Sequence, residues 1–582
     1  SGGGEFMDLA GDGQPDLAVL DGPMSGLFEH DLEEEWEPFR PFTSRLNRDM
    51  RDPNLKFVDL DGDGHADVLI TEDDAFVWHP SLAEEGFGPA QRVSQPFDEE
   101  KGPRVVFADG TQSIYLADLS GDGLTDIVRI RNGDVCYWPN LGYGRFGAKV
   151  TMDNAPWFDN LDQFDQKRIR LADIDGSGTT DIIYLHRDGV SLYFNQSGNN
   201  WSQPQRLKIF PRIDDLVSIV PVDLLGNGTA CLVWSSPLLG DTRRPMRYVN
   251  LMGGQKPHLL VKTINNLGAE TRVEYAPSTK FYLQDKRDGK PWFTRLPFPV
   301  HVVERVQTFD HITRNRFVTR YAYHHGYFDG EEREFRGFGM VEQFDTEAFE
   351  DYVVGVQAVG GAQELAPELN QPPVTTRTWY HTGAFLDKPR ILHQYRHEYY
   401  GQEQHIPEPI LQAGLNASEL RECVRALKGL PLRQEIYSYD GSAEQAHPYT
   451  VSENNFEIRW VQPRGGQRHG VFCAVGHESI SLNYERNPSD PRISHSFGLD
   501  LDEYGNARKS CAVVYGRKMT DASLPDKVTD DQQHRYITYA EADYTPDILQ
   551  TVPVEAYRLR VPFESRNYEI TGIVPDGTFF LF

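Results

Sequence analysis

Aspartate and glycine recur in the first 231 residues at a spacing that could hold a cation. In each nine-residue copy, positions one, three, five and nine carry mainly oxygen-bearing side chains, and positions four and six are glycine. Because glycine lets the backbone turn sharply, these oxygens and the carbonyl of position seven can converge on one point, as in a calcium loop. The candidate ligands are Asp8, Asp12 and Asp16; Asp59, Asp61, Asp63 and Asp67; Asp118, Ser120, Asp122 and Asp126; and Asp173, Asp175, Ser177 and Asp181.

A fifth copy is degenerate, since it keeps only Asp223 and Asn227 and ends at Cys231. The second copy offers the most carboxylates, so we expect Ca²⁺ first in the second to fourth loops and none in the fifth. The alternative is that aspartate and glycine form tight turns without any metal.

An EF-hand is the obvious rival for such a loop, but it requires flanking helices and a glutamate at position twelve. That position holds Ile70, Arg129 and Tyr184 in the second, third and fourth copies. The flanking segments are short β-type runs, such as 56–58 and 68–70 around the second loop. Each loop is therefore predicted to join two β-strands.

The length of the repeat indicates which structural unit holds each loop in place. The copies begin 50 to 59 residues apart, at Asp8, Asp59, Asp118, Asp173 and Asp223. Aromatic and glycine residues follow most copies, as in 77–88 and 137–147. A strand, a loop, a second strand and an aromatic strand in each repeat predict one four-stranded propeller blade per copy.

The rest of the chain has no further copy of the loop but stays rich in β-type segments. Alternating apolar and polar residues, as in 320–323 and 433–439, indicate strands with one solvated face. Only 345–355 and 417–427 are expected to be helical. The predicted fold class is all-β, with a propeller followed by large, irregular β-sheet segments.

Composition narrows the functional classes. The 582 residues carry a net charge of −29, which argues against nucleic-acid binding. No apolar run reaches the roughly 18 residues of a membrane span. The five cysteines are scattered without a CxxC pair, so we expect free thiols rather than disulfides or zinc ligands. Residues 1–5 read as a linker, and no signal peptide is visible.

The loop pattern resembles the FG-GAP/VCBS repeat of integrin-type propellers and bacterial secreted proteins. The chain as a whole resembles the B component of Tc toxin complexes, which shares its first part with SpvB-type virulence proteins. The segments that carry this resemblance are 256–260, 264–268, 274–278, 295–299, 327–339, 426–429, 485–486, 490–492 and 564–566, and 500–506 is similar to a YD-type (Rhs-like) repeat.

The resemblance implies a fragment with a propeller of six blades over residues 6–255, a first middle region over 256–345 and a shell-wall segment over 346–582. It implies a structural role in a secreted toxin complex. The propeller would close a β-sheet shell that holds an unfolded effector, and would dock onto the channel-forming A component so that the effector can be translocated. The C component would complete the shell and supply the effector.

Neither motif nor spacing predicts catalysis. The sequence has no GxSxG, HExxH, GxxxxGK[ST] or helix-heading GxGxxG motif. His324 and His325 are expected to be a packed or surface pair, and 331–334 a solvated charged turn. Two other functions remain open: an adhesion module that binds a protein or glycan through the propeller, and the amino-terminal part of an SpvB-type toxin.

Overall fold

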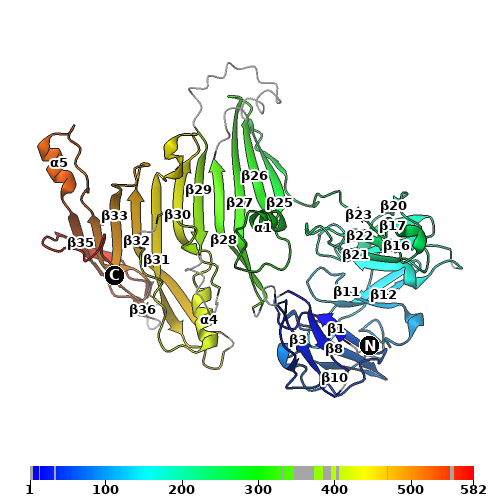
Figure 1. The fold of residues 1–582 in the computed structure, drawn as a ribbon. Helices are drawn as coiled ribbons and strands as arrows, with labels where there is room; N and C mark the ends of the chain where they lie inside the picture. Colours follow the sequence, from blue (N-terminus) through cyan, green and yellow to red (C-terminus); the bar gives the residue numbers. More distant parts are fainter. Residues whose placement is uncertain are drawn as a thin grey trace.

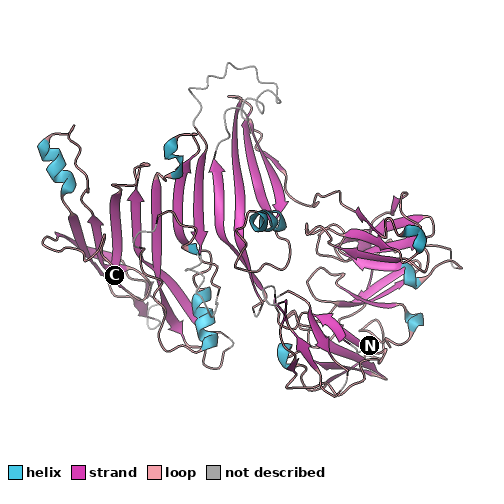
Figure 2. Cartoon of the chain, in the orientation of Figure 1, coloured by secondary structure: helices cyan, strands magenta, loops and turns pink. Residues whose placement is uncertain are grey.

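The computed structural model places an arc of small β-sheets beside one large, curved sheet (Figure 1). It describes residues 4–11, 13–21, 23–31, 35–160, 162–330, 332–345, 372–384, 395–401, 405–467, 469–550 and 556–582. Most of its regular secondary structure is β-strand, with a few short helices (Figure 2). The all-β prediction is confirmed.

The arc consists of five antiparallel blades, one for each loop motif. Each motif loop joins the first two strands of its blade, as the repeat predicted. The blades are β1 (Gly4–Met7), β2 (Asp16–Val19), β3 (Gly26–Phe28) and β6 (Arg40–Pro41); β7 (Leu55–Val58), β8 (Asp67–Glu72), β9 (Ala75–His79) and β10 (Gln91–Ser94); β11 (Ile114–Ala117), β12 (Asp126–Arg131), β13 (Asp134–Trp138) and β14 (Val150–Thr151); β15 (Ile169–Ala172), β16 (Asp181–His186), β17 (Gly189–Tyr193) and β20 (Gln205–Leu207); and β21 (Ser218–Val222), β22 (Cys231–Ser235) and β23 (Met246–Asn250).

Apolar cores hold neighbouring blades together. Leu27 and Val68 share a core between the first two blades, and Trp78 and Trp138 share the next one. Two further cores lie between blades three and four and between blades four and five. Each blade thus buries one face against the next, as sheets with one apolar face must.

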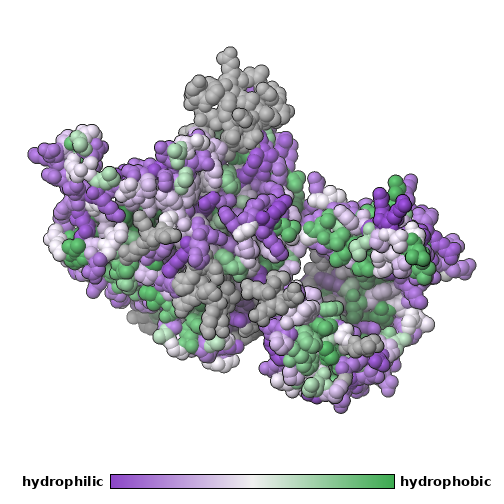
Figure 3. Space-filling view, in the orientation of Figure 1, coloured by the Kyte–Doolittle hydropathy of each residue, from purple (hydrophilic) through white to green (hydrophobic). Residues whose placement is uncertain are grey.

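The described residues form five blades and not the closed set of six that the resemblance implied. The last strand before the large sheet, β23, pairs with β22 inside blade five and so begins no further blade. One face of blade five is exposed at Val220, Val222, Met246 and Tyr248, which keep 45 to 65% of their surface accessible. Hydrophobic surface is visible on the propeller in Figure 3.

The remaining strands form one 13-stranded antiparallel sheet in which most strands pair with their neighbours in sequence. Alternation between buried and exposed residues, as in β33, fits a sheet with one covered face. The strands are β24 (Lys262–Ile264), β25 (Ala269–Pro277), β26 (His301–Asp310), β27 (Asn315–Asp329), β28 (Glu334–Asp345), β29 (Val374–Tyr380), β30 (Pro431–Ser438), β31 (Thr450–Gln462), β32 (Val471–Asn483), β33 (Arg492–Leu501), β34 (Ala507–Val514), β35 (Tyr536–Tyr544) and β38 (Pro562–Glu569). Three two-stranded hairpins complete the strands: β4 (His30–Asp31) with β5 (Glu35–Trp36), β18 (Asn195–Gln196) with β19 (Asn200–Trp201), and β36 (Ile548–Gln550) with β37 (Ala556–Arg558).

Three α-helices accompany the sheet in the described residues. The helix predicted at 417–427 is confirmed as α4 (Ala417–Arg425), which begins at a capping box formed by Asn416 and Glu419. The helix predicted at 345–355 lies outside the described residues except for Asp345, which ends β28. Two further helices, α1 (Ser278–Arg287) and α5 (Asp526–Gln533), were not predicted from the sequence.

Candidate functional site

The first aspartate of each motif closes its own loop. In the second loop, Asp59 Oδ1 accepts the N–H of Gly62 at 2.7 Å, and Asp59 Oδ2 accepts that of Gly64 at 2.8 Å. Both glycines have positive φ angles, 79° and 83°, which a side chain would strain. The same two-oxygen arrangement recurs at Asp8, Asp118 and Asp173. In the degenerate fifth loop, Asp223 Oδ1 accepts the N–H of Asn227 instead, and Asp223 Oδ2 accepts that of Gly228.

The aspartate at position nine is buried and joins three strands. Asp126 Oδ2 accepts the N–H groups of Leu119 and Ser120, and its Oδ1 accepts that of Asn140 after the third strand. Asp16 accepts three equivalent N–H groups, and Asp67 and Asp181 accept one at each oxygen. All three, like Asp126, expose none of their surface. The fifth copy has Cys231 in this place. These carboxylates therefore hold the blade together whether or not a metal is bound.

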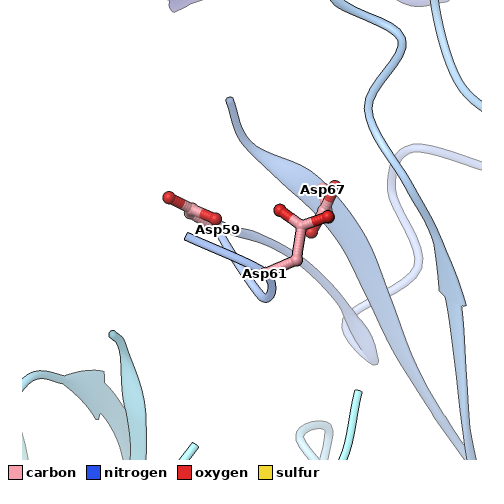
Figure 4. Close-up of side chains that lie close together, drawn as sticks. All are labelled: Asp59, Asp61 and Asp67. Carbon is pink, nitrogen blue, oxygen red and sulfur yellow. The ribbon is translucent and has the colours of Figure 1, made fainter. Parts of the chain in front are cut away.

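Two of the predicted loops bring three carboxylates within reach of one ion. One oxygen from each of Asp59, Asp61 and Asp67 lies within 4.8 Å of the others, and the same holds for Asp173, Asp175 and Asp181. Calcium binds oxygen at about 2.3 to 2.6 Å, so ligands of one ion lie at most about 5 Å apart. Figure 4 shows Asp59, Asp61 and Asp67 around the second loop. The donor set in these two loops fits Ca²⁺.

Burial disfavours the ionised form of the position-nine carboxylates in these two loops. It raises the pKa of Asp67 to about 7, despite the hydrogen bonds from Ser81 and Leu60. Burial likewise raises the pKa of Asp181 to about 7. At Asp175 burial is outweighed by hydrogen bonds, first that of His258, and the pKa is lowered. A bound divalent cation would stabilise the ionised form of the buried carboxylates.

The other predicted ligands do not join such a group among the described residues. Asp118, Asp122 and Asp126 of the third loop stay outside the two carboxylate clusters, as does Asp63. The hydroxyl of Ser120 donates to Asp118 Oδ1 at 3.3 Å, and that of Ser177 lies 3.1 Å from Thr179 Oγ1. Asp8 and Asp16 belong to the first loop, whose Asp12 lies outside the described residues.

Comparison with known proteins gives three matching families. The family model of the insecticide toxin TcdB middle/N-terminal region matches residues 195–356, and that of its middle/C-terminal region matches 422–550. The FG-GAP-like repeat matches 59–129. No curated protein sequence matches the chain.

Solved structures match nearly the whole chain. The Tc holotoxin pore of Photorhabdus luminescens is 28% identical over 97% of this chain, with a TM-score of 0.79. The chain belongs with the B components of Tc toxin complexes. A crystal structure of TcdB2 with TccC3 and Cdc42 is 27% identical over 97% of the chain with a TM-score of 0.71, and one of TcdB2 with TccC3 is 26% identical over 97% with a TM-score of 0.69. The chain spans 26 to 30% of the length of these three solved chains.

The residues of this Tc B-component chain that sequence reasoning passed over lie mostly outside the motifs. His324 and His325 are a packed pair, as expected, but each contacts a carboxylate: Asp285 Oδ2 at 2.6 Å and Glu398 Oε1 at 2.7 Å. Of the turn 331–334, which was expected to be solvated, the described residues 332–334 are only partly exposed, and Arg333 reaches the propeller loops. No sequence signal marked these contacts, since their partners lie far away in the chain.

All five cysteines are free, as predicted, and three of them, Cys136, Cys231 and Cys423, are buried. None of the helices that the structure describes has both the length and the apolar character needed to cross a lipid bilayer.

Proposed function

We propose that this chain is a non-enzymatic, structural and gating part of a secreted Tc-type toxin complex. The observation that carries the proposal is the agreement with the Tc holotoxin pore over 97% of the chain, at a TM-score of 0.79. This agreement includes both the arc of blades and the large sheet, so it supports a shared arrangement of the two parts and not only a shared propeller.

In this proposal the 13-stranded sheet forms part of the wall of a shell that holds an unfolded effector. The propeller closes the shell and docks onto the channel-forming A component, and the C component completes the wall. The structures of TcdB2 with TccC3 support the choice of partner. Thirteen strands paired without interruption suit a wall, because backbone hydrogen bonds along the sheet leave only its two edges open.

The docking role can be tested with purified components. The chain, tagged at its C-terminus, is mixed with the cognate A component, and co-elution is measured by size-exclusion chromatography. We expect the intact chain to form a complex with the A component. A chain that lacks the propeller, residues 6–255, should not form this complex. Absence of any association between the intact chain and the A component would contradict the docking role.

We further propose that the fragment has no hydrolase or transferase activity. A buried charged cluster in the sheet is satisfied internally: Arg433 Nε donates to Glu435 at 2.7 Å, and Arg433 also pairs with Glu453, which accepts from His405 at 2.8 Å. These contacts join β30 and β31 to a covering segment, which is a structural task. A turnover abolished by a single polar substitution would overturn this proposal.

Calcium is proposed for the second and fourth loops, where three carboxylates converge. The ion would supply positive charge to groups that burial leaves costly to ionise. We expect added Ca²⁺ to raise the melting temperature of the propeller and EDTA to reverse the shift. Asp61→Asn should reduce this response, whereas Asp122→Asn in the third loop should leave it unchanged. A melting temperature that is insensitive to millimolar Ca²⁺ would contradict the proposal.

A further inference from the structure

The motif loops stand side by side on one end of the propeller. A Cβ atom added at Gly11 would lie 2.9 Å from His65 Cε1 of the next loop. At Gly62 it would lie 3.0 Å from Leu124 Cδ2, and at Gly121 2.8 Å from Thr179 Cγ2. Position four of each of these loops therefore packs against position seven of the following loop, and together the loops make one continuous face.

At the blade-five end of this face, the sheet takes the place of a further loop. Gly226 faces Thr279 of α1, whose hydroxyl donates to the Gly226 carbonyl. His258 Nε2 lies 2.9 Å from Asp175 Oδ2 in the fourth loop. These residues follow blade five directly in the chain, so this end of the arc is also held covalently.

At the blade-one end, the sheet reaches the loops through the turn between β27 and β28 and through Pro297, whose Cβ a Cβ atom added at Gly13 would meet at 2.1 Å. Arg333, between β27 and β28, donates from Nη2 to the Gly64 carbonyl at 3.0 Å and from Nη1 to the Gly11 carbonyl at 3.4 Å. Its Nη1 lies 3.8 Å from Asp8 Oδ2. In Figure 1 this hairpin extends from the sheet towards the first blade. One guanidinium thus joins two neighbouring blades and the sheet.

The third loop differs from its neighbours. In the described part of the chain, no hydrogen bond or ion pair connects Asp118–Asp126 to the sheet. The sheet part therefore makes polar contacts with the loops at the two ends of the arc of blades, but not with the third loop in the middle.

We propose that the loop face is the surface by which the propeller binds its own shell sheet. At the end of the arc that has no covalent link to the sheet, Arg333 holds the two parts together through Gly11 and Gly64, and we call this contact the catch. A guanidinium presents several N–H donors in a fixed plane, so it can serve carbonyls on two blades at once. A lysine has one compact charge and cannot hold both carbonyls in the same way. Arg333 is a positioning residue: it fixes where blades one and two sit on the sheet.

Release of this catch would let the arc move about its covalent end near residues 251–261. That a partner at the propeller triggers the release rests on the proposed gating function. The catch itself is a property of this chain alone, so it can be tested without any partner.

Hydrogen–deuterium exchange of the full chain tests the catch. In Arg333→Ala we expect the amides of the first two loops, 8–16 and 59–67, to exchange about tenfold faster, because a charged hydrogen-bond donor to both loops is lost. Loop three, 118–126, should be unchanged and serves as an internal control. Arg333→Lys should give an intermediate rate.

Arg314→Ala is the matched control variant. Arg314 also has a positive φ angle, 61° against 49° for Arg333, and lies in the turn between β26 and β27. It should leave all three loops unchanged. Equal rates in wild type and Arg333→Ala at the first two loops, or equally faster exchange in loop three, would overturn the catch. A chain that fails to bind the A component but shows the expected exchange pattern would overturn the gating function and leave the catch standing.

Discussion

At the scale of single residues, the carboxylates of the motif do two different jobs. The position-nine aspartates are fully buried and accept backbone N–H groups from two other segments of their blade. At position five, Asp63, Asp122 and Ser177 are exposed to solvent. The cost of removing a carboxylate should therefore depend on its position in the loop and not on the loop's overall acidity.

Asp126→Ala tests this division in a loop outside the carboxylate clusters. The N–H groups of Leu119, Ser120 and Asn140 would lose their acceptor, so we expect the free energy of unfolding to fall by about 3 kcal/mol. Urea unfolding of the propeller gives the measurement. Asp122→Ala in the same loop should cost much less, because water can replace the exposed carboxylate. Similar losses in both variants would contradict a structural role for position nine.

His324 gives a prediction for pH. Burial alone would lower its pKa, but the carboxylates of Asp285 and Glu342 outweigh burial and raise the pKa to about 9. A raised histidine pKa stabilises the folded state fully below the unfolded value of about 6.5, and this contribution is lost as pH rises through about 9. The stability difference between wild type and His324→Gln should therefore shrink from pH 6 to pH 9.5. A difference that does not change with pH would contradict this.

At the scale of elements, loop geometry and helix signals explain what the sequence predicted and what it did not. The glycines at positions four and six and the β-type flanks predicted the strand–loop–strand units correctly. α4 was predictable because Asn416 and Glu419 form its capping box. α1 begins after Pro277 without a side-chain cap, and its buried Phe281 packs against β27. Its helical state depends on that tertiary contact, which no local signal reports.

Gly62→Ala tests the loop backbone. Gly62 has a φ angle of 79°, and a Cβ atom would lie 3.0 Å from Leu124 Cδ2. Left-handed backbone costs a non-glycine residue about 1 kcal/mol, so we expect at least this loss of stability. Gly110→Ala is the control, since a Cβ atom there meets nothing within 4 Å. Thermal melting of both variants gives the comparison, and an equal effect would contradict the strain.

At the scale of the whole molecule, the propeller and the sheet have separate cores. Four cores lie between neighbouring blades, while Ile480, Ile493 and Val513 belong to a core of the sheet. The two parts meet chiefly through polar contacts such as those of Arg333 and His258. Such an interface couples the parts weakly compared with a shared apolar core.

We therefore expect calorimetry to resolve two unfolding transitions. Trp138→Ala, in the core between blades two and three, should lower the propeller transition by an equivalent of about 4 kcal/mol. Ile480→Ala should lower only the sheet transition, by about 3 kcal/mol. If each variant shifted both transitions equally, the two parts would be one cooperative unit.

The sequence by itself determined the repeat, the position of each loop and the all-β character, because glycine spacing and strand alternation are local properties of the chain. Only the tertiary structure decided which carboxylates come within 4.8 Å of one another and that the described blades number five. It alone placed Arg333 against Gly11 and Gly64, residues more than two hundred positions away. Contacts of that sequence separation depend on how the sheet and the propeller pack, and no local pattern encodes that packing.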